Sequence, residues 1–333
     1  MKKYLGLFLA LLLMACSSDE KPAVSFYYWK TIYSLSAFEK QQLKENQVSK
    51  LYLRYFDIAL KDRVAIPLMP IRFQEKVDDF TVVPVVYIKN EVMLDPEIQV
   101  AALAQRTLSM IDKINEVNRI SVEEIQIDCD WTLKSREQFM AYIEALRRET
   151  TLKISATIRL HQIKYHRETG VPNVDRGVLM YYNMGRIDSD DLNSIYDAQT
   201  ASKYIKSAAH YPLALDVALP IFGWGVHLRN HKVVGLIPKI TDKQLQRDVK
   251  TQALGKHRFE VTEDIIAYGT YLRAGDQIKM EAVTKADLQE MVSELRKQLQ
   301  VVPREIIYYD LDSINLKTYS DEKEFYKKIN SGF

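Results

Sequence analysis

The chain has 333 residues, of which 47% are hydrophobic and 27% are charged, and its formal net charge is +2. This composition is typical of a soluble globular protein, and a nearly neutral chain gives no reason to expect a nucleic-acid partner. The only cysteines are Cys16 and Cys129. Because Cys16 belongs to the N-terminal segment described next, we expect neither an intrachain disulfide nor a cysteine-based zinc site.

The N-terminus has the pattern of a secretory signal peptide. The basic residues Lys2 and Lys3 precede an apolar run over 4–15. That run is shorter than the ~20 residues that a helix needs to cross a bilayer. It ends Leu13-Met14-Ala15-Cys16, which resembles the lipobox of bacterial lipoproteins, where the cysteine becomes the new N-terminus and carries the lipid. An ordinary signal peptide with a chance cysteine is the alternative.

These features predict a signal peptide over 1–15 and a polar tether over 16–23. The resemblance to lipoproteins implies a protein attached to the outer membrane by a lipid on Cys16, either on the periplasmic face or on the cell surface. The folded part is expected to begin near Ala23.

From residue 24 onward, apolar runs rich in β-branched or aromatic residues alternate with helical patterns. We expect strands over 24–29, 51–56, 82–87, 124–130, 152–158, 177–182, 213–220 and 305–309. We expect helices over 36–47, 96–117, 135–148, 284–299 and 321–329, and a further helix capped by Ser189 with Asp190 and Asp191 in its first turn.

The alternation predicts an α/β fold with parallel strands. Eight strand–helix units in about 310 residues match a (β/α)8 TIM barrel, which we expect as a single domain over 24–333. An open doubly wound sheet is the alternative, but no glycine-rich phosphate loop follows the first strand. Strand-like runs within 221–283 indicate a small insertion over about 225–283, between strand seven and its helix.

Aromatic residues gather at the predicted ends of the strands, where the chemistry of such barrels takes place. The three tryptophans follow strands one, four and seven, and three tyrosines lie at similar depth: Trp29, Trp131, Trp224, Tyr87, Tyr182 and Tyr309. Aromatic rings suit sugar recognition, because the apolar face of a pyranose stacks on a ring while nearby polar groups bind its hydroxyls. The alternative is that the rings only close the top of the barrel.

Strand four carries the sharpest polar pattern. Gln126, Asp128 and Asp130 alternate with apolar residues and therefore share one face. Both faces of a barrel strand are buried, so two carboxylates there need a role or a partner. Their mutual repulsion would raise the pKa of one of them, as in sites that keep an acid protonated. The alternative is a structural network in which Arg54 or Arg159 neutralises both.

Other polar residues give weaker signals. Asp310 and Asp312 share a face at the end of strand eight, although Asp312 could be only a capping residue. His161 is expected at the surface. His227 and His231 flank Arg229 in a segment that we expect to be a solvated insertion. The sequence contains no convincing metal-ligand spacing, phosphate loop or nucleophile elbow, so we expect no metal and no cofactor.

Four segments resemble the family 18 glycoside hydrolases, the chitinase-like barrels. They are 124–131 (EIQIDCDW), similar to the strand-four Asp-x-Asp-x-Glu motif, 180–183 (MYYN), similar to the strand-six Met-x-Tyr-Asp/Asn motif, 219–225 (LPIFGWG), similar to the strand-seven Pro-Phe-Tyr-Gly segment, and 308–312 (YYDLD), similar to the strand-eight segment. The insertion after strand seven also falls where chitinases carry one.

The resemblance implies catalytic roles for three residues. Asp130 takes the place of the family's glutamic acid, Asp128 that of the aspartate that assists the substrate's acetamido group, and Tyr182 that of the tyrosine that binds this group. In that mechanism the N-acetyl oxygen of the substrate is the nucleophile. The residues expected to contact the substrate are Trp29, Arg54, Gln126, Trp131, Asn183, Trp224, Tyr309 and Asp310.

The sequence departs from the motif at two positions. Asp130 is one methylene shorter than glutamate, and a misplacement of ~1 Å can cost ~100-fold in rate. Gln126 stands where the family has its first aspartate. These departures indicate altered chemistry or a site that only binds.

Three functions therefore remain open. The resemblance favours an envelope glycosidase that acts on a polysaccharide or N-acetylated glycan, with Asp130 as general acid. The others are a non-catalytic glycan-binding lipoprotein and an assembly lipoprotein whose surface binds another envelope protein. Fold alone does not decide among them.

Overall fold

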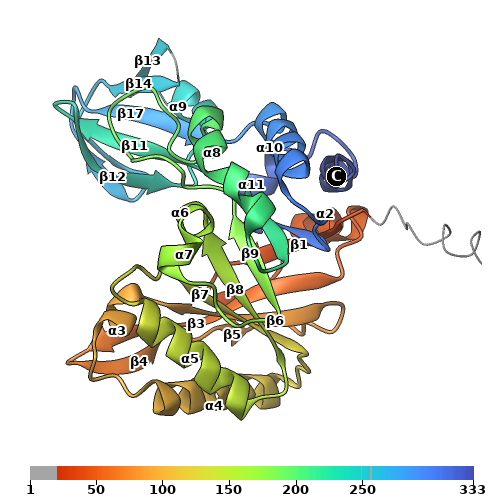
Figure 1. Ribbon diagram of the computed structural model, residues 1–333. Helices are drawn as coiled ribbons and strands as arrows, with labels where there is room; N and C mark the ends of the chain where they lie inside the picture. The colour runs from red at the N-terminus through yellow and green to blue at the C-terminus, as the bar shows by residue number, and fades with distance from the viewer. Residues whose placement is uncertain (1–20, 249, 256) are drawn as a thin grey trace, which may run out of the picture.

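The computed structural model describes residues 21–248, 250–255 and 257–333. Eight parallel strands close into a barrel in the order β1-β18-β10-β9-β8-β7-β6-β3, and pairing of β3 with β1 completes the ring (Figure 1). They are β1 (Ala23–Tyr28), β3 (Lys50–Lys61), β6 (Thr81–Ile88), β7 (Glu124–Cys129), β8 (Lys153–Arg159), β9 (Arg176–Met180), β10 (Leu215–Pro220) and β18 (Glu305–Tyr309). The predicted (β/α)8 barrel is confirmed. The predicted signal peptide and Cys16 lie outside the described residues.

Helices follow seven of the eight barrel strands and cover the outside of the barrel. They are α2 (Ala37–Glu45), α3 (Asn90–Leu94), α4 (Val100–Asn118), α5 (Arg136–Glu149), α6 (Leu160–Lys164), α7 (His166–Thr169), α8 (Ala198–Ile205) with the 3-10 turn η1 (Lys206–His210), α10 (Lys285–Gln298), α11 (Ser313–Lys317) and α12 (Phe325–Asn330). Ser36 and Thr284 form capping boxes at α2 and α10, as expected where a polar residue precedes a helical pattern. No described helix is long and apolar enough to cross a membrane.

The second barrel strand is followed by a hairpin and no helix. β3 is longer than the predicted run over 51–56, because its second half pairs with the antiparallel strand β4 (Val64–Leu68). The turn between them places Asp62 and Arg63 at positive φ. The chain then forms β5 (Arg72–Phe73), which pairs with β2 (Ile32–Tyr33) beside the barrel before β6 begins.

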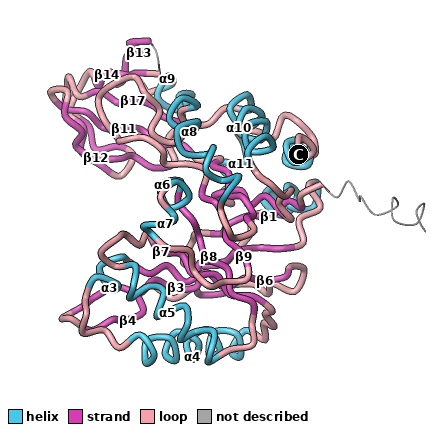
Figure 2. Tube along the Cα trace, viewed as in Figure 1, coloured by secondary structure: helices cyan, strands magenta, loops and turns pink. Residues whose placement is uncertain are grey.

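The predicted insertion between β10 and α10 is present and is built mostly of strands (Figure 2). Its five-stranded antiparallel sheet has the order β12-β11-β17-β14-β13, and a hairpin of β15 and β16 and the helix α9 accompany it. The bounds are β11 (Gly223–Arg229), β12 (Lys232–Pro238), α9 (Asp242–Arg247), β13 (Thr251–Gly255), β14 (Arg258–Val261), β15 (Ile265–Ala267), β16 (Thr270–Leu272) and β17 (Gln277–Ala282). The insertion has a small hydrophobic core of its own, distinct from that of the barrel.

The prediction of a helix capped by Ser189 is wrong. The segment after β9 runs as a loop, and α8 begins only at Ala198, capped by Asp197. The side chain of Asp190 accepts a hydrogen bond from Leu192 N at 3.1 Å, within its own loop. Such local bonds from Asp, Asn and Ser side chains compete with helix formation.

Candidate functional site

Five aromatic rings form a connected cluster at the C-terminal ends of the barrel strands. Tyr309, at the end of β18, lies at its centre: its ring centroid is 5.5 Å from that of Trp29 and 5.6 Å from those of Tyr182 and Phe222. Phe222 continues the chain of contacts to Trp224, 5.2 Å away. Tyr182 is buried, whereas the other four rings are partly exposed. We call these five residues the ring cluster.

The ring cluster follows from strand geometry. Trp29 comes one pleat after Tyr27, so both rings follow the inner face of β1, and Tyr27 lies below the cluster, 5.8 Å from Tyr309. The Tyr27 hydroxyl donates to Gln126 Oε1 at 2.7 Å. Gln126 is fully buried beneath the rings, so its predicted contact with substrate is wrong, and it supports Tyr27 from within the barrel.

The two carboxylates of the strand-four motif lie at the same end of the barrel as the ring cluster but in different surroundings. Asp128 is buried, and its Oδ1 accepts a hydrogen bond from Thr157 Oγ1 at 2.6 Å. Asp130 follows β7, and its side chain keeps 48% of its exposure. Because β7 and β8 pair in parallel, Arg159 at the end of β8 reaches both. Its Nε contacts Asp130 Oδ1, and its Nη2 lies 3.8 Å from Asp128 Oδ1.

Burial dominates the electrostatics of this group. It raises the pKa of Asp128, and the neighbouring Asp130 carboxylate adds to the rise, while Arg159 and the Thr157 hydroxyl oppose it. The pKa of Tyr87 is raised to about 12, first by burial and then by Asp130 and Asp128. The pKa of Asp128 is therefore raised mainly by burial, and the repulsion from Asp130 that the sequence predicted is a smaller contribution.

Arg159, and not Arg54, neutralises the strand-four carboxylates. Arg54 instead forms a two-pronged ion pair with Asp57, with Nε–Oδ1 and Nη2–Oδ2 distances of 2.7 and 2.5 Å. Its guanidinium also lies over the ring of Trp29, 5.9 Å from the centroid. Arg54 thus lies next to the ring cluster, and its guanidinium is already paired with Asp57.

The prediction that Trp131 lines the same aromatic face is wrong. Trp131 is fully buried, stacks on Phe139 of α5 at 4.5 Å, and donates from Nε1 to the carbonyl of Thr169 at 3.0 Å. The reason is that β7 ends at Cys129, and the chain then turns outward into the helical layer. Trp131 therefore packs between helices and belongs to the core.

The segment after β9 brings Tyr182 and Asn183 to the mouth of the barrel. Burial raises the pKa of Tyr182, and its hydroxyl lies 3.7 Å from Met180 Sδ. Asn183 is exposed at φ 53°, a conformation that asparagine adopts more readily than most residues. Its backbone N–H donates to the carbonyl of Ile195 at 2.9 Å, which ties the two ends of the loop together.

Trp224 enters the mouth from the insertion. It is the second residue of β11, and its Nε1 donates to Glu281 Oε2 at 3.0 Å. Glu281 is a buried residue of β17 that sequence reasoning missed. The sequence carries one signal for it, because Lys279 and Glu281 alternate with apolar residues on a short strand.

The two acids after β18 play different parts. Asp310 is largely buried and accepts a hydrogen bond from Asn315 Nδ2 at 2.6 Å, and burial together with the charge of Asp312 raises its pKa to about 6. Asp312 caps α11 and pairs with Lys239 of the insertion at 2.8 Å and with Lys30 at 3.4 Å. The expectation that Asp312 caps a helix is therefore met.

Two further observations concern histidines and metal binding. His227 is buried, with Nε2 2.7 Å from Asp276 Oδ2, so the prediction that it lies in a solvated segment is wrong. His161 is exposed, as predicted. Across residues 21–248, 250–255 and 257–333, no group of three His, Cys, Asp or Glu side chains is placed to hold a metal ion.

Two hollows of the surface lie away from the ring cluster. One, of about 540 Å³, lies between α10 and α12, and its lining includes Val292, Arg296, Phe325 and Lys328. The other, of about 470 Å³, lies between the β3–β4 hairpin and α4, and its lining includes Phe56, Pro67, Leu103 and Met110. Neither hollow is lined by a residue of the ring cluster. The case for the ring cluster as a site therefore rests on its aromatic side chains and on its position at the C-terminal ends of the strands.

No protein-family model matches the chain, and no curated protein sequence matches it. Its fold, however, resembles those of solved chitinases. A chitinase from Chromobacterium violaceum ATCC 12472 has a TM-score of 0.54 at 13% identity, covering 93% of this chain and 98% of that chain. A plant class V chitinase mutant from Cycas revoluta, solved in complex with (GlcNAc)3, has a TM-score of 0.54 at 12% identity with the same coverage.

A chitinase from Bacteroides thetaiotaomicron is similar to the same degree, with a TM-score of 0.53 at 12% identity over 92% of this chain and 95% of that chain. At 12–13% identity, this likeness shows the fold alone. The resemblance to chitinase-like barrels that four short motifs suggested therefore holds at the level of the fold, over 92–93% of the chain.

Proposed function

We propose that this protein binds carbohydrate at the mouth of its barrel, on the ring cluster. The observation that carries the proposal is the cluster itself, because Trp29, Tyr309, Phe222 and Trp224 are partly exposed and in contact in one row. Rings in such a row offer several stacking faces to the apolar sides of successive sugar units. Asp130 lies at the same end of the barrel, and its side chain, which is 48% exposed, can bind sugar hydroxyls.

The contact between Arg159 and Asp130 favours binding over cleavage. A general acid must carry a proton, whereas the ion pair with Arg159 needs an ionised carboxylate. Asp130 is also one methylene shorter than the glutamate of the motif that it resembles. A substrate would therefore have to displace Arg159 before Asp130 could act as an acid.

We propose an N-acetylated glycan as the ligand. Support comes from the fold, because the Cycas revoluta chitinase was solved with (GlcNAc)3. Support also comes from the sequence, because Asp128 and Tyr182 match the residues that engage an acetamido group in the motifs that they resemble. A buried carboxyl with a raised pKa can carry a proton and then donate to an acetamido oxygen.

Hydrolysis by the same site is the second candidate, and one observation favours it. Asp128 has a raised pKa and lies one pleat from Asp130, as a carboxyl that shares protons with a neighbouring acid would. In this alternative Asp130 is the general acid, Asp128 orients the acetamido group and Tyr182 binds its oxygen. Product release that depends on Asp130 would establish it.

We also propose that the protein is attached to the outer membrane by a lipid on Cys16. The described chain enters β1 at Ala23, at the end of the strands opposite the mouth. An anchor close upstream of Ala23 would leave the mouth directed away from the membrane, toward a glycan. An assembly role with a protein partner in place of a glycan is the outcome that remains if no glycan binds.

The test uses protein that begins at Ser17, so that no lipid is attached. Binding to chito-oligosaccharides and to oligosaccharides without N-acetyl groups is measured by calorimetry, and release of reducing ends is followed in parallel. We expect binding of the N-acetylated series without product, and loss of binding in Trp29→Ala. Product from wild type but not from Asp130→Asn would replace this proposal by the hydrolase, and no binding to either series would contradict both.

A further inference from the structure

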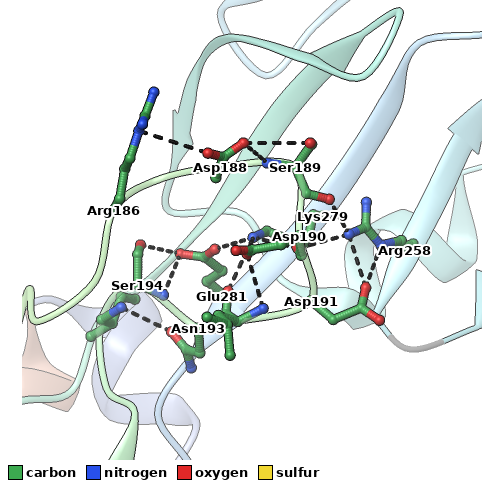
Figure 3. A network of polar contacts seen from close by, with 12 residues as sticks. Arg186, Asp188, Ser189, Asp190, Asp191, Asn193, Ser194, Arg258, Lys279 and Glu281 are labelled. Atoms are coloured by element: carbon green, nitrogen blue, oxygen red, sulfur yellow. Dashed lines mark hydrogen bonds and ion pairs between the residues drawn. The ribbon is translucent and has the colours of Figure 1, made fainter. Parts of the chain in front are cut away.

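The insertion and the loop after β9 meet in a dense polar network beside the mouth (Figure 3). The loop supplies Asp190, Asn193 and Ser194, and the insertion supplies Lys279 and Glu281 of β17 and Arg258 of β14. The network joins two parts of the chain that each carry a residue predicted to touch the ligand. Asn183 lies at the start of the loop, and Trp224 lies on the insertion.

Glu281 is the point where these two parts meet. Its side chain is only 2% exposed, and Oε2 accepts hydrogen bonds from Trp224 Nε1 at 3.0 Å and from Ser194 N at 3.2 Å. The Ser194 hydroxyl donates to the same oxygen. On the other side of the carboxylate, Lys279 Nζ lies 2.6 Å from Oε1. One carboxylate therefore holds an indole of the ring cluster and the backbone of the neighbouring loop.

Strand geometry explains why Glu281 reaches Trp224. β11 and β17 are antiparallel neighbours, and Trp224 is paired directly with Glu281 across the ladder, so both side chains stand on the same face of the sheet. Lys279 lies one pleat away on that face and donates to the carbonyls of Asp190 and Leu192, at 3.0 and 3.1 Å. The loop after β9 therefore packs against this face at Lys279 and Glu281.

The remaining contacts hold the middle of the loop, between Ser189 and Asn193. Arg258 Nη2 donates to the carbonyls of Ser189 and Asp190, at 2.6 and 2.8 Å. Asn193 Nδ2 donates to the carbonyl of Ala282 at 2.8 Å. Buried polar groups that are joined in this way hold one arrangement, because any other leaves a charge without a partner.

We propose that Glu281 is the positioning residue of the mouth, holding the indole of Trp224 and the loop after Tyr182 in one preformed wall against which the ligand stacks. The expected effect of Glu281 on affinity rests on the proposed carbohydrate site, whereas its effect on the position of Trp224 does not. A wall that is already ordered before binding loses less conformational entropy when the ligand binds. Loosening the wall therefore weakens binding without removing any contact to the ligand.

The test compares Glu281→Gln with wild type in protein labelled with 5-fluorotryptophan. The chain has three tryptophans, so the ¹⁹F spectrum should show three signals, assigned by Trp→Phe variants. We expect the Trp224 signal to shift and broaden in Glu281→Gln, while the signal of Trp131 in the helical layer stays in place and reports that the barrel is folded. The Kd for the chito-oligosaccharide that binds wild type should rise about tenfold.

Two further variants keep the inference falsifiable. Glu260→Gln changes a partly exposed carboxylate on β14 of the same sheet and should leave the Trp224 signal and the Kd as in wild type. Ser194→Ala keeps the Lys279–Glu281 pair, so it tests the link if Glu281→Gln does not fold. Ser194→Ala should speed hydrogen exchange of the loop amides. It should also shift the Trp224 signal in the same direction as Glu281→Gln does, but by a smaller amount.

The outcomes separate this inference from the proposed function. An unmoved Trp224 signal in the folded Glu281 and Ser194 variants overturns the positioning role. A moved signal with unchanged affinity overturns the claim that the wall matters for binding. If wild type binds no glycan at all, the carbohydrate site is wrong, and the Trp224 signal and the loop exchange still decide whether Glu281 positions the indole.

Discussion

The guanidinium of Arg159 contacts the carboxylate of Asp130, so the residue that the sequence suggested as a general acid is engaged in an ion pair. The same guanidinium lies 3.8 Å from Asp128. Arg159 therefore lies between two acids that differ in exposure: Asp130 faces solvent, whereas Asp128 is buried. Its removal should affect the two unequally.

We expect Arg159→Leu to lower the free energy of unfolding at pH 7 by about 3 kcal/mol, because Asp128 is left as a buried charge without a cation. Replacing Asp128 by Asn as well should recover most of the loss, since the amide can still accept from Thr157. Urea denaturation of both variants measures this. Arg106→Leu, an exposed arginine on α4, is the control and should change stability by less than about 0.5 kcal/mol.

The pH dependence of Arg159→Leu gives an independent check. The pKa of Asp128 in the folded state is raised above its unfolded value, so the folded state binds the proton more tightly. The stability lost in Arg159→Leu should therefore decrease as the pH falls toward 4 and increase as the pH rises above 4. A penalty that stays constant from pH 4 to pH 8 would show that Asp128 is not the group responsible.

A second prediction concerns Asp310, whose pKa in the folded protein is raised to about 6 by burial and by the charge of Asp312. The stability that this group contributes is complete below pH 4 and is lost as the pH rises through 6. Asp310→Asn keeps an acceptor for Asn315 and removes the charge. It should raise the free energy of unfolding at pH 7 by about 2 kcal/mol and leave it unchanged at pH 4.

Asp312→Asn is the matched variant, and it should change the free energy of unfolding at pH 7 in the opposite direction, by lowering it. The pKa of Asp312 is lowered, with burial opposed by Lys239, the N–H of Ile314 and Lys30. Its contribution to stability is therefore present at neutral pH and is lost as the pH falls through the folded-state pKa. If both asparagine variants changed stability in the same direction at pH 7, the assignment of these two carboxyls would be wrong.

Trp29 and Trp131 should separate binding from stability. Trp131→Phe leaves the carbonyl of Thr169 without its donor and opens space beside Phe139, so we expect a loss of about 2 kcal/mol with the glycan affinity unchanged. Trp29→Phe should weaken glycan binding and change stability by less. Calorimetric titration and urea denaturation of both variants are needed, and equal effects of the two on affinity would contradict the separation.

The sequence predicts the barrel well because both faces of its strands are buried, which leaves long apolar runs between helical patterns. It also places Trp29, Tyr182, Trp224 and Tyr309 together, because all of them follow the ends of parallel strands. Trp131 shows the limit of that rule. A residue two positions beyond a strand, as Trp131 is beyond β7, can turn outward with the chain, and its direction depends on the helix that follows.

Two pairings at the mouth could not be predicted from spacing. On a regular strand Arg54 and Asp57 would point to opposite sides, but the register of β3 against β6 shifts between Arg54 and Phe56, and the bulge lets them meet. The contact between Trp224 and Glu281 joins strands separated by the whole insertion. Its register depends on the loops between β11 and β17 and cannot be read from either strand alone.

The last prediction tests the packing of the barrel wall below the mouth. Gly177 lies in β9, where an added methyl group would come within 2.7 Å of Leu215 Cδ2 and 2.9 Å of Ile158 Cγ1. Both are side chains of neighbouring barrel strands, so relief requires the wall itself to move. We expect Gly177→Ala to lower the free energy of unfolding by about 1–3 kcal/mol in urea denaturation.

Gly235→Ala is the control, because on β12 an added methyl group meets no atom within 4 Å. Its stability should stay within about 0.5 kcal/mol of wild type. Equal stability of the two variants would mean that the wall accommodates the methyl group, and the close packing of β8, β9 and β10 would then not be what makes glycine necessary at position 177.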